Sequence, residues 1–128
     1  IIVDEDISVS EGHYISEMVR TRLVNEVDVV ADALVHIDPE DDTHLMPARD
    51  LPSRTVVRAQ LKACFKDIDA ATHIERITLH YVGGRLRIEL LLPLSVLASP
   101  ADGPALTARF HAAAAKNPLI DALDVRFH

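Results

Sequence analysis

Residues 74–92 read IERITLHYVGGRLRIELLL, with an apolar run on either side of Gly83-Gly84. A two-glycine loop suits a tight β-hairpin, because both turn positions of such a loop need positive φ angles. In the second run Leu86, Ile88 and Leu90 alternate with charged residues, which is typical of a strand with one buried and one wet face. The stretch therefore predicts two antiparallel strands, 74–82 and 85–92.

Helical patterns lie on both sides of this hairpin. Before it, Ser53 can cap a helix that runs to about Phe65, with core positions at Val57, Leu61, Cys64 and Ile68. After it, Ser99-Pro100-Ala101-Asp102 begins a helix that carries Leu106, Phe110 and Ala113 and ends near Asn117-Pro118, and a last strand follows at 122–127. The order αββαβ predicts an α+β, ferredoxin-like unit: a small mixed or antiparallel sheet with both helices on one face.

The beginning of the chain repeats the last three elements of this unit. Residues 1–3 are a strand end, and Ser8 and Glu11 form a capping box for a helix over 8–25, with buried positions expected at Ile15, Met18, Val19 and Leu23. A strand over 33–37 then stops at Asp38-Pro39. Residues 1–3, 8–25 and 32–36, overlaid on 90–92, 99–116 and 124–128 so that His36 matches His128, indicate an internal repeat whose first copy is truncated at its N-terminus. The expected domains are 1–42 for the truncated copy, 43–52 for a linker, and 53–128 for the second copy.

Composition limits the classes of protein that fit. The 128 residues, 48% hydrophobic and 26% charged, correspond to one soluble domain or two small ones. The longest uncharged stretch, 90–101, is far shorter than the ~20 apolar residues of a membrane span. The single cysteine, Cys64, allows neither an internal disulfide nor a thiolate zinc cluster, and it is expected to be a buried, inert thiol. Because the chain begins inside a strand and without Met, we expect a fragment of a longer protein.

The charge is concentrated at one end of the sequence. The net charge is −7, which opposes binding to nucleic acid. Residues 1–50 hold thirteen acidic and three basic residues, a net −10, whereas residues 51–128 hold seven acidic and ten basic ones, a net +3. The acidic part would raise the local concentration of cations, unless it is only a solvated acidic surface.

Two short stretches carry a resemblance to a known family. Residues 3–13, VDEDISVSEGH, and residues 35–39, VHIDP, are similar to the C-terminal cytoplasmic domain of the cation diffusion facilitator, or cation efflux, transporters. Over 53–128 the likeness is one of element order, with Tyr81-Val82-Gly83-Gly84 at the hairpin. The resemblance implies an αββαβ domain at the cytoplasmic face of the inner or plasma membrane. It would form a homodimer beneath the transmembrane domain of the same protein.

The resemblance also implies a metal site at His13, His36 and Asp38. The cation would be divalent, zinc first, with iron, manganese, cobalt, nickel or cadmium as alternatives. The residues agree in part, because His36 and Asp38 are two apart on a strand and so leave the same face, and imidazole with carboxylate suits such ions. The alternatives are a solvated histidine at 13, an ordinary exposed strand histidine at 36 and a turn residue at 38. Pro104 stands where the second copy would need His13, so the second copy is expected to bind no metal.

Enzyme motifs are missing from the sequence. There is no glycine-rich phosphate loop or nucleophile elbow, so the chain is not expected to be an enzyme. The expected function is regulation and dimerisation of a divalent metal efflux transporter by a domain that binds or senses zinc-like cations. The alternative is a ferredoxin-like regulatory or oligomerisation module that binds a small metabolite or a partner protein without metal. The other histidines, such as His73, His80 and His111, are expected in surface or packing roles.

Overall fold

The computed structural model describes residues 1–4, 7–39 and 51–128. The chain divides into two compact units, a first unit, Ile1–Met46, and a second unit, Pro47–His128. Of the linker expected at 43–52, all but Leu51 and Pro52 lies outside the described residues. None of the helices in these described ranges is long and apolar enough to cross a bilayer.

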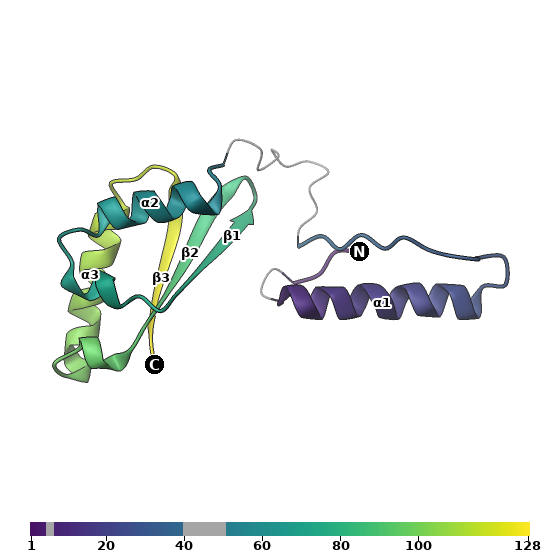
Figure 1. Ribbon diagram of the computed structural model, residues 1–128, viewed down its shortest axis with the longest axis horizontal. Helices are drawn as coiled ribbons and strands as arrows, with labels where there is room; N and C mark the ends of the chain where they lie inside the picture. Colours follow the sequence, from purple (N-terminus) through teal and green to yellow (C-terminus); the bar gives the residue numbers. More distant parts are fainter. Residues whose placement is uncertain (5–6, 40–50) are drawn as a thin grey trace. The chain divides into compact units, whose positions relative to one another are not determined.

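The second unit has the predicted αββαβ order (Figure 1). Its elements are α2 (Arg54–Cys64), β1 (Arg76–Val82), β2 (Arg85–Leu92), α3 (Gly103–Ala114) and β3 (Ile120–Phe127). Three short 3-10 helices, which the sequence patterns did not predict, are η3 (Asp69–His73), η4 (Leu94–Val96) and η5 (Pro100–Asp102). The sheet order is β1-β2-β3, with β1 antiparallel and β3 parallel to β2, so the sheet is mixed and the fold is α+β.

The glycine loop closes the hairpin as its sequence predicts. Gly83 and Gly84 have φ angles of 62° and 69°, a region that side-chain-bearing residues rarely adopt. Val82 and Arg85 are directly paired across the two strands, which leaves a loop of two residues. The loop thereby fixes which β2 side chains face the helices.

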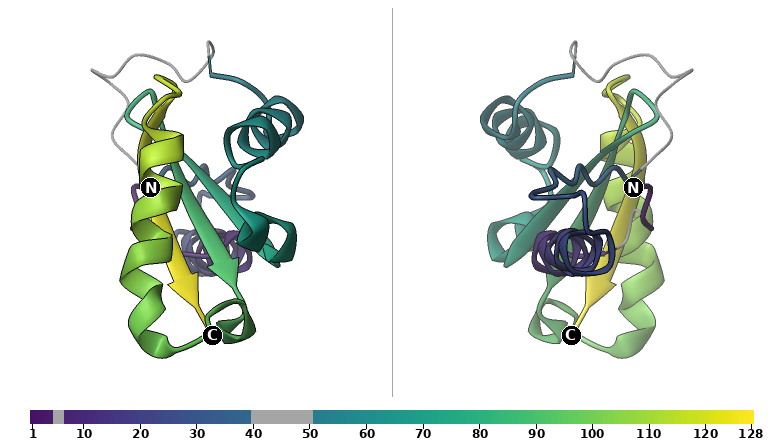
Figure 2. Two further views of the ribbon diagram at one scale, coloured as in Figure 1. Left: turned by 90° about the vertical axis from the view of Figure 1, so that its left-hand side faces the viewer. Right: turned by 90° about the vertical axis from the view of Figure 1, so that its right-hand side faces the viewer.

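The core lies between the sheet and the two helices, which cover the same side of it (Figure 2). The inward side chains of β2 are almost inaccessible, and Phe110 of α3 packs edge-on against Phe65 with ring centroids 5.0 Å apart. The predicted positions Val57, Leu61, Ile68 and Leu106 are buried, but Cys64 and Ala113 are only half-buried. Ala114 is buried in place of Ala113, because it continues the four-residue spacing from Leu106 and Phe110.

The first unit contains the helix that the capping signal predicts. Helix α1 (Val9–Glu26) begins after Ser8, whose Oγ accepts a hydrogen bond from the backbone N–H of Glu11 at 3.1 Å. Its expected buried stripe is only partly covered. Ile15 and Val19 are half-buried, but the side chains of Met18 and Leu23 are 51% and 41% exposed. The strand-like segment after α1 runs along the helix (Figure 1), and Ile7 lies beside Gly12, but these contacts leave part of the stripe open.

The two strands expected in the first unit are reduced to one parallel bridge, between Ile2 and Asp38. The N–H of Asp38 donates to the carbonyl of Ile1, and the N–H of Val3 donates to the carbonyl of Asp38, both at 2.9 Å. Residues 1–4 and 33–37 do not pair with each other in a β-ladder. The interpretation of 33–37 as a regular strand is therefore wrong for the structure as described.

The second unit repeats this pair of hydrogen bonds where β2 and β3 end. The N–H of His128 donates to Leu92, and the N–H of Leu94 donates to the carbonyl of His128. The pattern matches Ile1 with Leu92 and Asp38 with His128. The sequence overlay had matched residues 1–3 with 90–92 and His36 with His128, and it is therefore displaced. Similar residue types suggested that overlay. The hydrogen bonds show which residues of the two units occupy equivalent places in the fold.

Candidate metal centre

Two of the three predicted ligands line the same hollow of the first unit. His13 is in the first half of α1, and His36 is in the extended segment that returns along the helix. The hollow has a volume of about 450 Å³, and its apolar walls include Val3, Ile7 and Ile37. Helix and segment approach closely at Gly12, which is buried, and Ser16 Oγ donates to the carbonyl of Val35 at 3.3 Å. The fold thus places two histidines that are 23 residues apart in the sequence at the wall of one hollow.

The third predicted ligand contacts one of these histidines. Asp38 Oδ2 lies 2.8 Å from His36 Nδ1, and the side chain of His36 is 82% exposed whereas that of Asp38 is 33% exposed. Asp38 is not among the residues that line the hollow. The predicted pair on one strand face is therefore close together, but the carboxylate is directed at the imidazole.

The donor types fit a zinc-like cation, although they do not form a full coordination sphere. In the described parts of the chain, no three histidine, cysteine or acidic side chains are grouped closely enough to hold a metal ion. Two imidazoles with a neighbouring carboxylate are donors that zinc and other first-row divalent ions accept. A tetrahedral site built on His13 and His36 would need further donors, from water or from another chain.

Asp32 is an acidic residue of the first unit that already has a cationic partner. Asp32 Oδ1 accepts a hydrogen bond from the N–H of Ala33 at 2.9 Å and lies 2.7 Å from Arg20 Nη2. The backbone hydrogen bond first, and then the Arg20 guanidinium, lower the pKa of the Asp32 carboxyl. Because Arg20 balances its charge, Asp32 contributes less than its formal charge to the field that would attract a cation.

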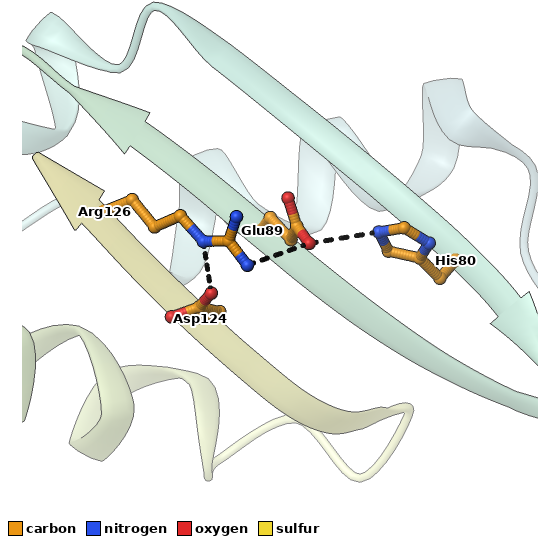
Figure 3. Close-up of polar contacts among 4 residues, drawn as sticks. All are labelled: His80, Glu89, Asp124 and Arg126. Carbon is orange, nitrogen blue, oxygen red and sulfur yellow. Dashed lines mark hydrogen bonds and ion pairs between the residues drawn. The ribbon is translucent and has the colours of Figure 1, made fainter. Parts of the chain in front are cut away.

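The second unit has a guanidinium where the first has an imidazole. With Asp38 matched to His128, the residue at the position of His36 is Arg126. Arg126 Nε donates to Asp124 at 2.6 Å, and its Nη2 lies 3.4 Å from Glu89 Oε1 (Figure 3). An arginine does not ligate metals, because its guanidinium stays protonated. This difference agrees with the expectation that the second unit binds no metal, which stays a prediction.

The charged network around Arg126 was not predicted from the sequence. On the sheet face away from the helices, His80 Nε2 lies 3.4 Å from Glu89 Oε1 and has no hydrogen-bond partner among the described residues. His80 therefore has an acidic neighbour, which the sequence spacing did not reveal. The signal was the alternation of polar residues along all three strands, but the cross-strand contacts depend on a register that only the folded sheet sets.

In a comparison with protein families, residues 1–40 match the cation efflux protein, cytoplasmic domain. The first unit is therefore similar to a segment of that domain. The resemblance drawn from residues 3–13 and 35–39 is thereby confirmed, and all three predicted ligands lie inside the matched range. The domain belongs to transport proteins and not to an enzyme family. Comparison with curated proteins and with solved structures gives no match.

The relation of the second unit to this cation efflux domain rests on other observations. The family match ends at residue 40, before the second unit begins. In the second unit α3 lies between β2 and β3, as α1 lies between residues 1–4 and 27–39 in the first unit, and the hydrogen bonds at Asp38 recur at His128. A tandem second copy remains the interpretation that explains both features.

Proposed function

We propose that the chain is a cytoplasmic regulatory and dimerisation part of a divalent metal efflux transporter, and that its first unit senses zinc-like cations. The match of residues 1–40 to a cation efflux cytoplasmic domain carries this proposal. In it the chain acts at the cytoplasmic face of a membrane, attached to the transmembrane domain of the same protein. The transported ion is substrate for that domain and ligand for this one.

The proposed metal site consists of His13, His36 and Asp38. Its support is the hollow that both histidines line and the contact of Asp38 with His36. The surrounding sequence is acidic, with a net charge of −10 over residues 1–50, which favours the approach of cations. A bound divalent ion would reduce the repulsion among these acids.

Sensing follows from the place of the two histidines on different elements. His13 belongs to α1 and His36 to the segment that ends at the Ile2–Asp38 bridge. A cation that binds both imidazoles favours the arrangement in which helix and segment are held together, and it shifts the population toward that arrangement. The domain would thereby report the metal concentration to the rest of the transporter.

The test is the thermal midpoint of the chain with and without zinc, near pH 7 and near pH 5.5. We expect zinc at a hundred times its dissociation constant to stabilise the first unit by about 2.7 kcal/mol at neutral pH. The stabilisation by zinc should be smaller near pH 5.5. An imidazole must be neutral to bind a metal, and a free imidazole ordinarily gains a proton near pH 6.5.

Two histidine variants make this test specific. His36→Ala should abolish the shift produced by zinc, whereas His128→Ala should leave it unchanged, because His128 is at the end of β3 in the other unit and contacts Glu75 at 2.7 Å. A zinc shift that acid does not diminish, or one that both variants remove equally, would contradict histidine-based sensing. The chain would then be better described as a regulatory or oligomerisation module that binds a small metabolite or a partner protein without metal.

Dimerisation is proposed on the family match and on the exposed apolar side chains of the first unit. Tyr14 and Met18, one turn apart on α1, are 63% and 51% exposed, and Ile2 is 62% exposed. Exposed apolar groups gathered on one element are typical of a surface that another chain covers.

Sedimentation equilibrium of the chain and of lysine variants tests this association. Tyr14→Lys and Met18→Lys should each weaken it, whereas Leu94→Lys should not, although Leu94 of the second unit is similarly exposed at 53%. A clean monomer of the unaltered chain at high concentration, with zinc present, would contradict the dimer.

A further inference from the structure

The second unit contains a hollow of about 660 Å³, which is lined by residues of α2, η3 and β1 and of the segments next to them. Its most buried side chains are apolar, because Leu61, Phe65 and Ile68 are almost inaccessible to solvent. Ile74, just before β1, and Ile77, within it, add half-buried apolar groups. A recess of this size with apolar walls and a few polar groups is typical of sites for small molecules.

Basic side chains line the same hollow. Arg58 and Lys62 are four residues apart on α2, and Lys66 follows four residues later, just beyond the end of that helix. All three are exposed, and none makes an ion pair or a side-chain hydrogen bond with another described residue. Like charges four residues apart on a helix repel one another. Asp69 also lines the hollow, but basic side chains outnumber acidic ones there by three to one.

We propose that this hollow binds an amphipathic organic anion, that is, a carboxylate or phosphate group attached to an apolar chain or ring. The anionic group would lie among Arg58, Lys62 and Lys66 and reduce their repulsion. The apolar part would enter the hollow and cover its apolar side chains, which removes apolar surface from water. This inference goes beyond the proposed metal sensing and does not rest on it, because the hollow belongs to the other unit.

The burial of the apolar groups favours a molecule that enters the hollow over a membrane surface. Apart from Ala59, every apolar side chain that lines the hollow is buried or half-buried. A flat bilayer surface would meet the exposed basic side chains but would not reach the buried ones. Charge and shape together therefore fit an anion with an apolar body better than a negatively charged surface.

The first test titrates the whole chain with sodium decanoate, below the concentration at which it forms micelles, and follows the backbone amide signals by NMR. We expect saturable shifts concentrated in residues 58–77. Decanol, which has the same chain without the charge, and acetate, which has the charge without the chain, should each bind more weakly. If decanoate produces no saturable shifts in residues 58–77, the proposal is wrong.

Two variants test the charge and the space separately. Lys62→Glu should weaken decanoate binding about 3- to 10-fold, because it replaces a favourable charge contact with a repulsive one. It also relieves like-charge repulsion along α2, so the unit should stay folded. Ala59→Trp, at an exposed position that lines the hollow, should weaken binding by filling the space. Lys116→Glu is the control, because this exposed lysine of the same unit does not line the hollow. Equal losses in Lys62→Glu and Lys116→Glu would show only a general attraction of anions and would overturn the proposal.

Sedimentation with vesicles of phosphatidylserine and phosphatidylcholine distinguishes a lipid from a free acid. Vesicle binding that both Lys62→Glu and Ala59→Trp weaken would identify the ligand as a lipid whose chain enters the hollow. Decanoate binding without vesicle binding would identify a free acid. Vesicle binding that Lys62→Glu removes and Ala59→Trp leaves unchanged would instead show contact with a membrane surface, and the hollow would not be a binding site.

The two units give separate readouts. His36→Ala should leave decanoate binding unchanged, and Lys62→Glu should leave the stabilisation by zinc unchanged. A chain that binds decanoate but not zinc would contradict the proposed metal sensing alone. A chain that zinc stabilises but that does not bind decanoate would contradict the anion site alone.

Discussion

Individual acidic side chains of the first unit have different partners, and the partner decides what each can do. Asp32 is held by a backbone N–H and by Arg20, so its charge is balanced within the unit. Asp38 instead contacts His36, a side chain that can also bind a cation. The count of acids in the sequence does not distinguish these two cases. The difference lies in which basic group the fold brings within hydrogen-bonding distance.

The pKa of Asp32 is expected to be below the usual value for an aspartate, and Arg20→Gln should raise it only part of the way. The backbone hydrogen bond from Ala33 is the larger cause and remains in that variant. Since the pKa is lowered in the folded state, the contribution of Asp32 to stability is present at neutral pH. It is lost as the pH falls through the lowered pKa.

NMR titration of the Asp32 side chain in both proteins measures this effect. Arg22→Gln is the control, because Arg22 pairs with Glu26 and not with Asp32. A pKa that returns fully to the usual value in Arg20→Gln would show that the Ala33 hydrogen bond has no effect.

Elements of the same sequence pattern differ in burial between the two units. The hydrogen-bond correspondence of Ile1 with Leu92, continued along the chain, matches Val19 of α1 with Phe110 of α3 and Leu23 with Ala114. Phe110 is fully buried and Ala114 is 3% exposed, whereas Leu23 is 41% exposed. Helix α3 packs against α2 and the sheet, and the described part of the first unit contains no second helix to cover α1.

The hairpin turn should be sensitive to a side chain for backbone reasons alone. Gly83→Ala is expected to destabilise the second unit by about 1 kcal/mol, because a Cβ at this positive φ is strained although no atom within 4 Å obstructs it. Gly12→Ala is the control. A Cβ there would meet Ile7 and Ile37 at an ordinary 3.7 Å, and alanine favours a helix.

Urea denaturation of the two variants measures the difference. If Gly12→Ala loses as much stability as Gly83→Ala, the cost does not come from the positive φ angle.

The apolar burial of the described residues is concentrated in the second unit. Every fully buried apolar side chain of the described residues belongs to that unit, and among described residues the first unit has only Gly12 buried. Apolar burial is the main favourable term in folding, so the first unit gains much less of it per residue. A unit with so little buried surface can respond strongly to a cation or to a partner chain.

A pair of matched core substitutions should reveal this asymmetry. Phe110→Ala is expected to cost the second unit about 3–5 kcal/mol, the usual range for a fully buried phenylalanine. Val19→Ala, at the matching position of α1, should cost less than about 1.5 kcal/mol, because its side chain is half-exposed.

Amide hydrogen exchange, which reports on each unit separately, is the measurement for this pair. We expect strong protection in β2 and α3 and weak protection in α1. Equal protection in α1 and α3 of the unaltered chain would show that the first unit has a core that its described residues do not contain.

The sequence by itself determined the local structure of the first unit and its resemblance to a known family. The glycine pair fixed the hairpin, alternating residues fixed the buried face of β2, and Ser8 fixed the start of α1, because each depends on neighbours in the chain. Residues 3–13 and 35–39 were sufficient to indicate the cation efflux domain. Only the tertiary structure decided that His13 and His36 share a hollow, that Asp38 contacts His36, and that Asp38 corresponds to His128. These facts depend on contacts and hydrogen-bond register between distant segments, which spacing along one chain does not specify.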